Sequence, residues 1–268
     1  MTQQSWSGSR RVLLTLGGLT LISACAGPGP EPAGPAPATP PPSPVQPSVP
    51  PPVPPPSPTP TGLPTIPVQT KPLYVVPAAS VPQGSKAVAL TFDDGPHPAY
   101  TPQVLKILRQ HHVKATFFVI GQQAHDNPDL LRSIVDQGHV IGTHTWAHKD
   151  VSKMSAGRAR TEIGRAVDTV AATIGHIPSL FRAPYGSWSP TAFQVCAALG
   201  QTSIAWDVDP RDWDNPGSEQ ITSKVLHQVG NRSIVLNHDG GGDRSATVRA
   251  LRQFLPVLAD RGYRFVGV

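Results

Sequence analysis

The sequence has few cysteines, few aromatic residues and few charged residues, and these shortages exclude whole classes of protein. Only two cysteines occur in 268 residues, Cys25 and Cys196, so no disulfide framework is available. Aromatic residues make up 6% of the chain, and the basic residues are scattered, so no aromatic-basic module for RNA or DNA is present. We therefore expect no nucleic-acid partner, although the net charge is +5.

Long apolar runs are also lacking, and the run near the N-terminus is too short to span a membrane. Arg10 and Arg11 precede the run VLLTLGGLTLISA, whose 13 residues fall short of the roughly 20 that a spanning helix needs. A charged start and an apolar run of this length are typical of a signal peptide. We expect residues 1–24 to be a signal peptide, and the paired arginines leave general and twin-arginine export both open.

The apolar run ends in LISAC, which resembles a bacterial lipobox. The resemblance implies cleavage before Cys25 and lipidation of its thiol. The protein is then expected to be extracytoplasmic, held by lipid to the outer face of the bacterial cell membrane. An ordinary signal peptide with a chance cysteine is the alternative.

Proline is abundant, with 33 residues, most of them between Pro28 and Pro82. A tract rich in Pro, Ala, Ser and Thr has too few large apolar residues to offset the entropy of ordering the chain. We expect residues 25–72 to be a disordered tether behind the lipidated cysteine, and residues 73–268 to form one catalytic domain. Polyproline II segments of about 3.1 Å per residue would hold that domain away from the membrane.

The presumed domain alternates short β-branched runs with longer helical patterns. The candidate strands are AVALTF, ATFFVI, HVIGTH, SLFRAPY, TSIAWDV, SIVLNH and YRFVGV. The candidate helices are TPQVLKILRQHH, NPDLLRSIVDQG, SAGRARTEIGRAVDTVAATIG, SPTAFQVCAALG, residues 218–229 and ATVRALRQFLPVLADRG. Strict alternation of strands and helices predicts an α/β fold with a parallel sheet. The pattern does not distinguish a doubly wound open sheet from a barrel. Cys196 falls in an apolar helical pattern and is expected to be a buried core residue.

Polar residues follow five of the predicted strands. In α/β barrels the carboxyl ends of the strands form one rim, and sites are built there. The residues that fall at these ends are Asp93, Asp94, His144, His148, Arg182, Tyr185, Asp209, Asp212 and His238.

Two of these segments suggest a metal hydrolase. TFDDGP alone is more typical of a turn, but adjacent carboxylates also allow one to ligate a divalent ion while the other takes a proton from water. HTWAH spaces His144 and His148 four residues apart, which on a helical turn would place both imidazoles on one face. With Asp94 they make a set of two histidines and one carboxylate, which suits zinc or a related divalent ion.

RAPYG, DPRDW and VLNHD are weak signals when each is taken alone. A surface salt bridge would explain Arg182, a loop turn with a packed indole would explain DPRDW with its Asp209, Asp212 and Trp213, and a capping role would explain His238.

Taken in order, the five segments resemble the polysaccharide deacetylase family, also called carbohydrate esterase family 4, over roughly residues 86–268. The resemblance implies a distorted (β/α) barrel of about seven parallel strands, one divalent metal ion, most commonly Zn²⁺ with Co²⁺ as an alternative, and a polysaccharide substrate. It makes Asp93 the general base, with Asp94, His144 and His148 as metal ligands. His238 becomes the general acid.

The resemblance also implies supporting roles. Arg182 would orient the base, the backbone N–H of Tyr185 would face the oxyanion, and Asp212 would hold His238. Trp213 and Leu236 would form the walls of the acetyl pocket, and the role of Asp209 is left open.

We therefore expect a metal-dependent hydrolase that removes N-acetyl groups from N-acetylglucosamine-type residues of peptidoglycan or a chitin-like oligosaccharide and releases acetate. The alternatives are an O-acetyl esterase acting on acetylated xylan and a noncatalytic wall-binding lipoprotein. The catalytic domain is expected to be monomeric.

Overall fold

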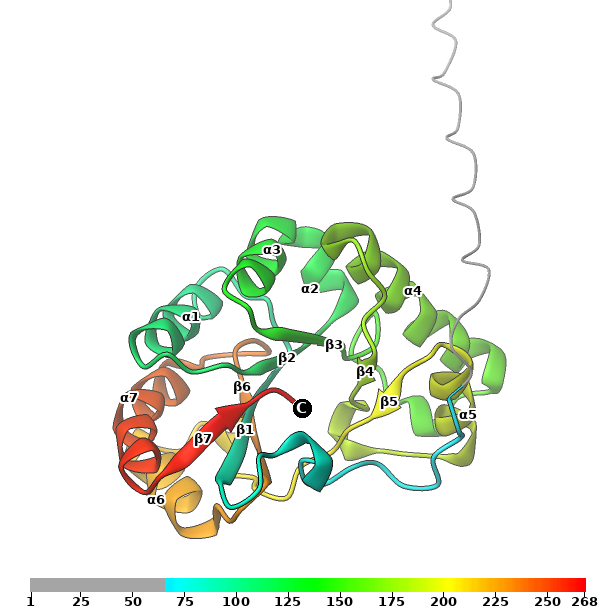
Figure 1. Cartoon of the computed structure of the whole chain (residues 1–268). Coiled ribbons are helices and arrows are strands. Elements are labelled where there is room, and N and C mark those ends of the chain that lie inside the picture. The colour runs from blue at the N-terminus through cyan, green and yellow to red at the C-terminus, as the bar shows by residue number, and fades with distance from the viewer. Residues whose placement is uncertain (1–65) are drawn as a thin grey trace, which may run out of the picture. The chain divides into compact units, whose positions relative to one another are not determined.

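The computed structural model describes residues 66–268, a curled sheet with helices around it (Figure 1). The expected signal peptide, the expected lipidation site at Cys25 and the expected tether up to residue 65 lie outside the described residues. The expected domain boundary at residue 73 stays a prediction; residues 66–72 are described, and Gln69 contacts the sheet. Within the described chain, no helix is both long and apolar enough to cross a membrane.

Seven strands form the sheet: β1 (Lys86–Asp93), β2 (Thr116–Val119), β3 (Val140–Thr143), β4 (Leu180–Phe181), β5 (Thr202–Ser203), β6 (Ser233–His238) and β7 (Tyr263–Val266). Their order is β5-β4-β3-β2-β1-β6, every pairing is parallel, and β7 pairs with the first half of β1. The strands curl into an incomplete barrel, which confirms the predicted distorted (β/α) barrel and decides against an open sheet.

The helices of the described chain lie outside the sheet, and Figure 1 shows them around its convex side. They are α1 (Thr101–Gln110), α2 (Gly121–Asp126), α3 (Pro128–Asp136), α4 (Ala156–Ile174), α5 (Pro190–Ala198), α6 (Ser218–Gln228) and α7 (Ser245–Asp260), with 3-10 turns η1 (Ala78–Ser80), η2 (Val151–Lys153), η3 (Pro184–Gly186) and η4 (Asp212–Asp214). Proline in the first turn starts α1, α3 and α5, and Gly175 ends α4 in the left-handed conformation.

Side chains of β1 alternate between two cores, as the pleat of a strand requires. Val88, Leu90 and Phe92 are buried in the outer core under the helices, whereas Ala89 faces the barrel interior. The inward set ends in polar residues at the carboxyl end of the strand, where Asp93 lies. The alternation that buries the strand therefore also points its last carboxylate into the barrel.

The opposite end of the barrel is filled by apolar side chains. Phe118 and Ile234 belong to the inner core, and the C-terminal Val268 packs against this core. The backbone N–H of Val268 donates to Thr116 Oγ1 at 3.1 Å, and the C-terminus lies at the centre of the curled sheet (Figure 1).

The predicted strands and helices are confirmed, with three differences. SLFRAPY is a strand only at Leu180–Phe181. TSIAWDV is a strand only at Thr202–Ser203; the chain then crosses to β6, where Val208 bridges Val235. The short helix α2 was not predicted. Cys196 is buried as predicted, and burial raises the pKa of its thiol to about 12.

Candidate active site

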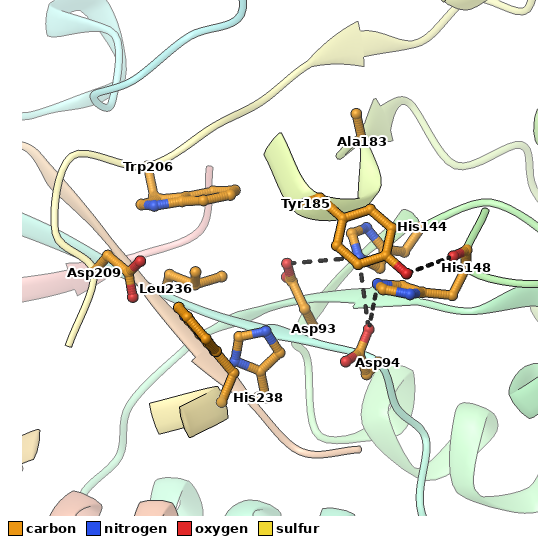
Figure 2. A pocket seen from close by; sticks show the side chains of 11 residues that line it. Asp93, Asp94, His144, His148, Ala183, Tyr185, Trp206, Asp209, Leu236 and His238 are labelled. Carbon is orange, nitrogen blue, oxygen red and sulfur yellow. Dashed lines mark hydrogen bonds and ion pairs between the residues drawn. The ribbon is translucent and has the colours of Figure 1, made fainter. Parts of the chain in front are cut away.

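A cavity of about 380 Å³ is lined by residues that follow the carboxyl ends of the strands (Figure 2). Its lining residues are Asp93, Asp94, His144, His148, Ala183, Tyr185, Trp206, Asp209, Trp213, Leu236 and His238. Arg182 and Asp212 lie directly behind the lining and are 0% and 1% exposed. The structure thus brings together every polar residue that the sequence places at the strand ends.

Two lining residues, Trp206 and Ala183, were not singled out from the sequence. Trp206 lies within the predicted strand TSIAWDV, where an indole is expected to pack in a core. It packs against the inner core and also lines the cavity (Figure 2), because β5 ends at Ser203 and the chain leaves the sheet.

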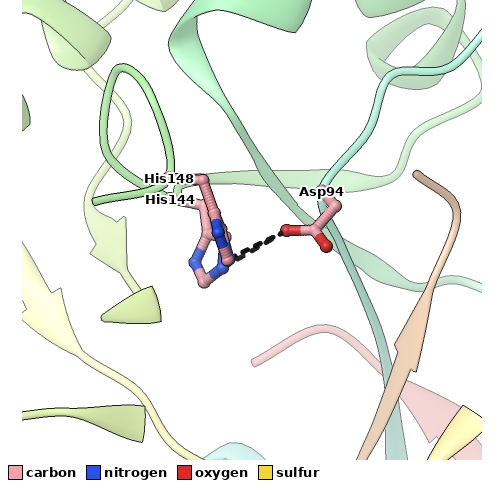
Figure 3. Close-up of side chains that lie close together, drawn as sticks. All are labelled: Asp94, His144 and His148. Carbon is pink, nitrogen blue, oxygen red and sulfur yellow. Dashed lines mark ion pairs between the residues drawn. The ribbon is translucent and has the colours of Figure 1, made fainter. Parts of the chain in front are cut away.

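Asp94, His144 and His148 form a group of candidate metal ligands, which we call the metal cluster. Their ligand atoms all lie within 4.8 Å of one another (Figure 3). Asp94 Oδ1 lies 3.6 Å from His144 Nε2 and 3.3 Å from His148 Nε2. The predicted helical turn through HTWAH is wrong. This segment is an irregular loop with positive φ at Thr145 (64°) and His148 (53°), and the loop itself turns the second imidazole back toward the first.

The donor set fits a divalent cation. His144 Nδ1 is 2.8 Å from the carbonyl oxygen of Arg182, so Nδ1 carries the proton and the Nε2 lone pair faces Asp94. Burial lowers the pKa of His144 to about 3, which keeps the ring neutral. Asp94 Oδ1 is buried without a hydrogen-bond partner among the described residues. A lone pair facing an unpartnered carboxylate oxygen is unfavourable unless a cation lies between them.

Asp93 is paired with Arg182 in the barrel interior. Arg182 Nη1 donates to Asp93 Oδ1 at 2.7 Å and to Thr91 Oγ1 at 2.8 Å, and its Nη2 donates to the Ala205 carbonyl at 2.9 Å. Burial raises the pKa of Asp93, and the guanidinium acts in the opposite direction. Asp93 Oδ2 lies 3.9 Å from His144 Nε2, so the free oxygen of this carboxylate is beside the metal cluster.

His238 is paired with Asp212, and it lies beside Asp93 in the parallel pairing of β6 with β1. Its Nδ1 is 2.7 Å from Asp212 Oδ1, and its backbone N–H donates to Asp212 Oδ2 at 2.8 Å. Thr247 Oγ1 donates to the same oxygen. Burial opposes a charge on His238, but the Asp212 carboxylate outweighs burial and raises the pKa of the imidazole to about 9. The ring is therefore cationic at neutral pH.

Helix α4 holds the HTWAH loop, which the sequence did not reveal. Glu162 accepts from the backbone N–H of Trp146 through its carbonyl and from that of Ala147 through Oε2, at 2.9 and 3.2 Å. The Arg165 guanidinium lies 3.6 Å from the centre of the Trp146 ring. From the other side, the N-terminus of α2 donates to the carbonyl oxygens of Thr145 and Trp146. These partners fix the loop that carries His148.

The glycines after His238 allow a close approach to the Asp94 segment. A Cβ atom at Gly240 would collide with the Asp94 carbonyl, and one at Gly241 would collide with the Asp94 carboxylate. Asp239 accepts from Thr101, and its backbone N–H donates to the carbonyl of Asp93 at 3.1 Å. Residues 239–241, which follow β6, therefore pack directly against Asp93 and Asp94.

Aromatic side chains stand at the mouth of the cavity. Tyr185 is 70% exposed and Trp213 is 43% exposed, whereas Leu236 is buried. The centres of the Tyr185 and His148 rings lie 4.7 Å apart. Figure 2 shows the two rings next to each other. Asp209 lines the cavity, and its Oδ1 accepts from the backbone N–H of Arg211, as expected of a loop turn.

The sequence model of the polysaccharide deacetylase family matches residues 80–204. The chain is also 43% identical over 190 residues to a peptidoglycan-N-acetylglucosamine deacetylase of Bacillus cereus, covering 70% of this chain and 89% of that protein. The chain belongs to the polysaccharide deacetylase family. The resemblance inferred from the five motifs is thereby confirmed.

Other family members agree with this assignment. A chitooligosaccharide deacetylase of Sinorhizobium fredii is 43% identical over 195 residues, covering 67% of this chain and 89% of the relative. A crystal structure of a peptidoglycan N-acetylglucosamine deacetylase superposes with a TM-score of 0.67 at 34% identity, covering 70% of this chain and 88% of that one. The chain therefore belongs to the same family as these deacetylases and shares their fold.

Proposed function

We propose that the protein is a metal-dependent N-deacetylase acting on N-acetylglucosamine-type residues of peptidoglycan or of a chitin-like oligosaccharide. One observation carries the proposal: a single cavity is lined by a carboxylate, an imidazolium and a ligand cluster for a divalent ion. Amide hydrolysis needs a base for the attacking water and an acid for the leaving nitrogen, and this cavity offers both.

Asp94, His144 and His148 would hold the ion, with Zn²⁺ as the first candidate and Co²⁺ as a substitute, because two imidazoles and one carboxylate leave further positions open. When bound, the ion supplies Lewis acidity that polarises the acetyl carbonyl and makes water a better nucleophile.

Asp93 acts as the general base. Its Oδ1 is held by Arg182, which leaves Oδ2 to accept the proton of the attacking water. Burial raises the pKa of Asp93, and a raised pKa makes a carboxylate a stronger base. Arg182 keeps it ionised in spite of that burial and fixes its direction.

His238 acts as the general acid. Because Nδ1 is engaged by Asp212, the proton on Nε2 is the one available to the departing sugar nitrogen. The backbone N–H of Tyr185 would donate to the oxyanion that forms on the acetyl carbonyl. Trp213 and Leu236 would contact the acetyl methyl group, and Trp206 lies close enough to share this role.

Acetate release is the direct test. The purified protein with saturating Zn²⁺ or Co²⁺ should release acetate from chitooligosaccharides or peptidoglycan. No release from these glycans or from acetylated xylan would reject the enzyme and favour a wall-binding protein. Release from acetylated xylan alone would make it an O-acetyl esterase.

Asp93→Asn tests the base. The variant should fold and bind the metal ion, while kcat falls by a factor on the order of 10²–10⁴. An unchanged kcat would exclude Asp93 from this role.

The same proposal places the enzyme outside the cytoplasm, held by lipid at Cys25 and acting as a monomer on a wall polymer. The signal-like run and the LISAC segment support this location. Expressed with its N-terminal segment in a bacterium, the protein should be recovered with membranes, and Cys25→Ser should move it to the soluble extracytoplasmic fraction. Recovery of both forms in the same fraction would contradict a lipid anchor at this residue.

A further inference from the structure

Residues 69–76, which we call the N-terminal strap, precede the stretch that the family model matches, which begins at residue 80. They nevertheless form part of the folded sheet. Leu73 bridges Ile204 in parallel, just beyond the end of β5, and Val75 bridges Ser233 of β6. The strap therefore connects the last strand on one side of the incomplete barrel to the last strand on the other.

The contact with β5 uses backbone groups that no other strand of the described sheet reaches. The Leu73 N–H donates to the Ser203 carbonyl at 2.9 Å, and the Ala205 N–H donates to the Leu73 carbonyl at 2.7 Å. The Gln69 side-chain amide extends the ladder: its Oε1 accepts from the Ser203 N–H at 2.6 Å, and its Nε2 donates to the Ser203 carbonyl at 3.3 Å. The strap thus replaces a missing neighbouring strand.

The other end of the strap is fixed at β6. The Val76 N–H donates to the Arg232 carbonyl at 2.8 Å, and Arg232 Nε donates to the Val76 carbonyl at 2.6 Å. Val76 is 0% exposed and belongs to the inner core. Anchored at both ends, the strap can hold β5 in register.

A chain of three contacts leads from the strap to the general base. The Ala205 N–H donates to the Leu73 carbonyl, and the Ala205 carbonyl accepts from Arg182 Nη2. Arg182 Nη1 in turn donates to Asp93 Oδ1. β5 is only two residues long, and β4 is its one strand partner in the sheet. Without the strap, the Ala205 N–H would lose its partner, whereas Ile204 would stay paired with Phe181 and Asp207 with Ile234.

We propose that Gln69 and Leu73 are positioning residues for the Arg182–Asp93 pair. The catalytic consequence rests on the proposed function, since it requires Asp93 to be the base. The structural consequence does not: loss of the strap contacts should loosen residues 203–206 and the Arg182 guanidinium whether or not the chain is an enzyme.

The histidine loop of the metal cluster is fixed by α2 and by Glu162 of α4, and the strap forms hydrogen bonds with neither element among the described residues. His144 also donates to the Arg182 carbonyl, but the Arg182 backbone is held to β3 by its own N–H, which donates to the Thr143 carbonyl at 3.0 Å, whereas the strap acts on the guanidinium. The proposal is therefore distinguishable from a general loss of stability. Disrupting the strap should therefore lower kcat and leave the affinity for the metal ion unchanged.

The experiment uses the full chain with Gln69→Ala, which removes both amide contacts with Ser203, and with Leu73→Pro, which removes the N–H donor. Thr70→Ala is the matched control, since Thr70 is an exposed strap residue whose side chain makes no hydrogen bond among the described residues. Hydrogen exchange of peptides covering residues 203–206, the Zn²⁺ dissociation constant and steady-state kinetics are measured for each.

In Gln69→Ala and Leu73→Pro, exchange at residues 203–206 should accelerate, and kcat should fall on the order of tenfold with unchanged KM and Zn²⁺ affinity, because small displacements of a positioned group are costly. The loss from Gln69→Ala should vanish in an Arg182→Lys background, because both changes act through the same pair. The control should behave as wild type.

Unchanged exchange at residues 203–206 would overturn the proposal, as would a parallel loss of Zn²⁺ affinity or an additive double variant. If Leu73→Pro fails to fold, Gln69→Ala decides. If the wild-type protein releases no acetate, the proposed function fails while the exchange data still test the strap.

Discussion

The pKa values of Asp93 and His238, two ionisable residues at the cavity, are shifted by different causes. Asp93 is a buried carboxylate beside an arginine, and burial raises its pKa. His238 is a buried imidazole beside a carboxylate, and its pKa is raised to about 9. A base and an acid are thereby available together at neutral pH, which is the requirement for hydrolysis of an amide with a poor leaving group.

Asp212→Asn should abolish the elevated pKa of His238. An amide cannot stabilise the imidazolium as the carboxylate does, so burial then dominates and the pKa falls from about 9. The alkaline limb of the kcat/KM profile should move to lower pH, and kcat at pH 7 should fall by a factor on the order of 10²–10⁴.

The same substitution should change the pH dependence of stability. A folded-state pKa above the unfolded value gives stability that is complete below about pH 6.5 and is lost as the pH rises through about 9. The stability difference between wild type and variant should therefore shrink across this range in chemical denaturation. Asp214→Asn, an exposed neighbour in the same turn, is the control, and an unshifted alkaline limb in Asp212→Asn would contradict the pairing.

Sequence could predict the polar residues of the cavity because they lie at strand ends, and parallel strands bring their carboxyl ends to one rim. Asp93, His144 and His238 were found in this way. Glu162 could not be found, because its contact with Ala147 joins residues 15 apart through a loop whose path depends on positive φ angles. Trp206 was missed because an indole in an apolar run is expected in a core.

Helix α4 supports the metal cluster through the loop that carries His148. Its Glu162 side chain is 12% exposed and contacts both the Ala147 N–H and Lys149. Hydrogen-bond partners behind metal ligands typically affect affinity by about 10–100-fold. Glu162→Ala should therefore weaken Zn²⁺ binding by about that factor, measured by competition with a chromogenic chelator.

Two matched variants test whether the Glu162–Ala147 contact is the cause of the expected loss of Zn²⁺ affinity. Glu162→Gln keeps an oxygen that can accept from Ala147 and should retain most of the affinity. Asp168→Ala removes an exposed carboxylate from the same helix and should have no effect. Equal affinity in Glu162→Ala and wild type would show that the loop is held without this contact.

The ends of helices and strands could be predicted where an apolar pattern extends over many residues. They could not be predicted where tertiary contacts determine where the element ends. β1 and β6 agree with their apolar runs within a residue or two, and α4 is bounded by Ser155 and Gly175 as predicted. β5 is much shorter than its apolar run, because after Ser203 the chain pairs with the strap and then with β6. Such pairing has no local sequence signal, and neither does the strap.

At the scale of the whole molecule, the metal cluster joins segments that are distant in sequence. Asp94 follows β1, and the two histidines follow β3. Without an ion, the buried Asp94 Oδ1 has no hydrogen-bond partner among the described residues, and Asp93 lies beside it. An ion that binds here should therefore stabilise the folded state over the unfolded chain, which has no such site.

Removal of metal by a chelator should lower the melting temperature, and Zn²⁺ should restore it. At a free concentration of 100 times the dissociation constant the gain is about 2.7 kcal/mol, which corresponds to about 5–10 °C for a domain of this size. His148→Ala should remove most of this increment because it takes away one ligand, whereas His227→Ala, an exposed histidine on α6, should keep it. An equal Zn²⁺ increment in all three proteins would mean that the ion binds elsewhere.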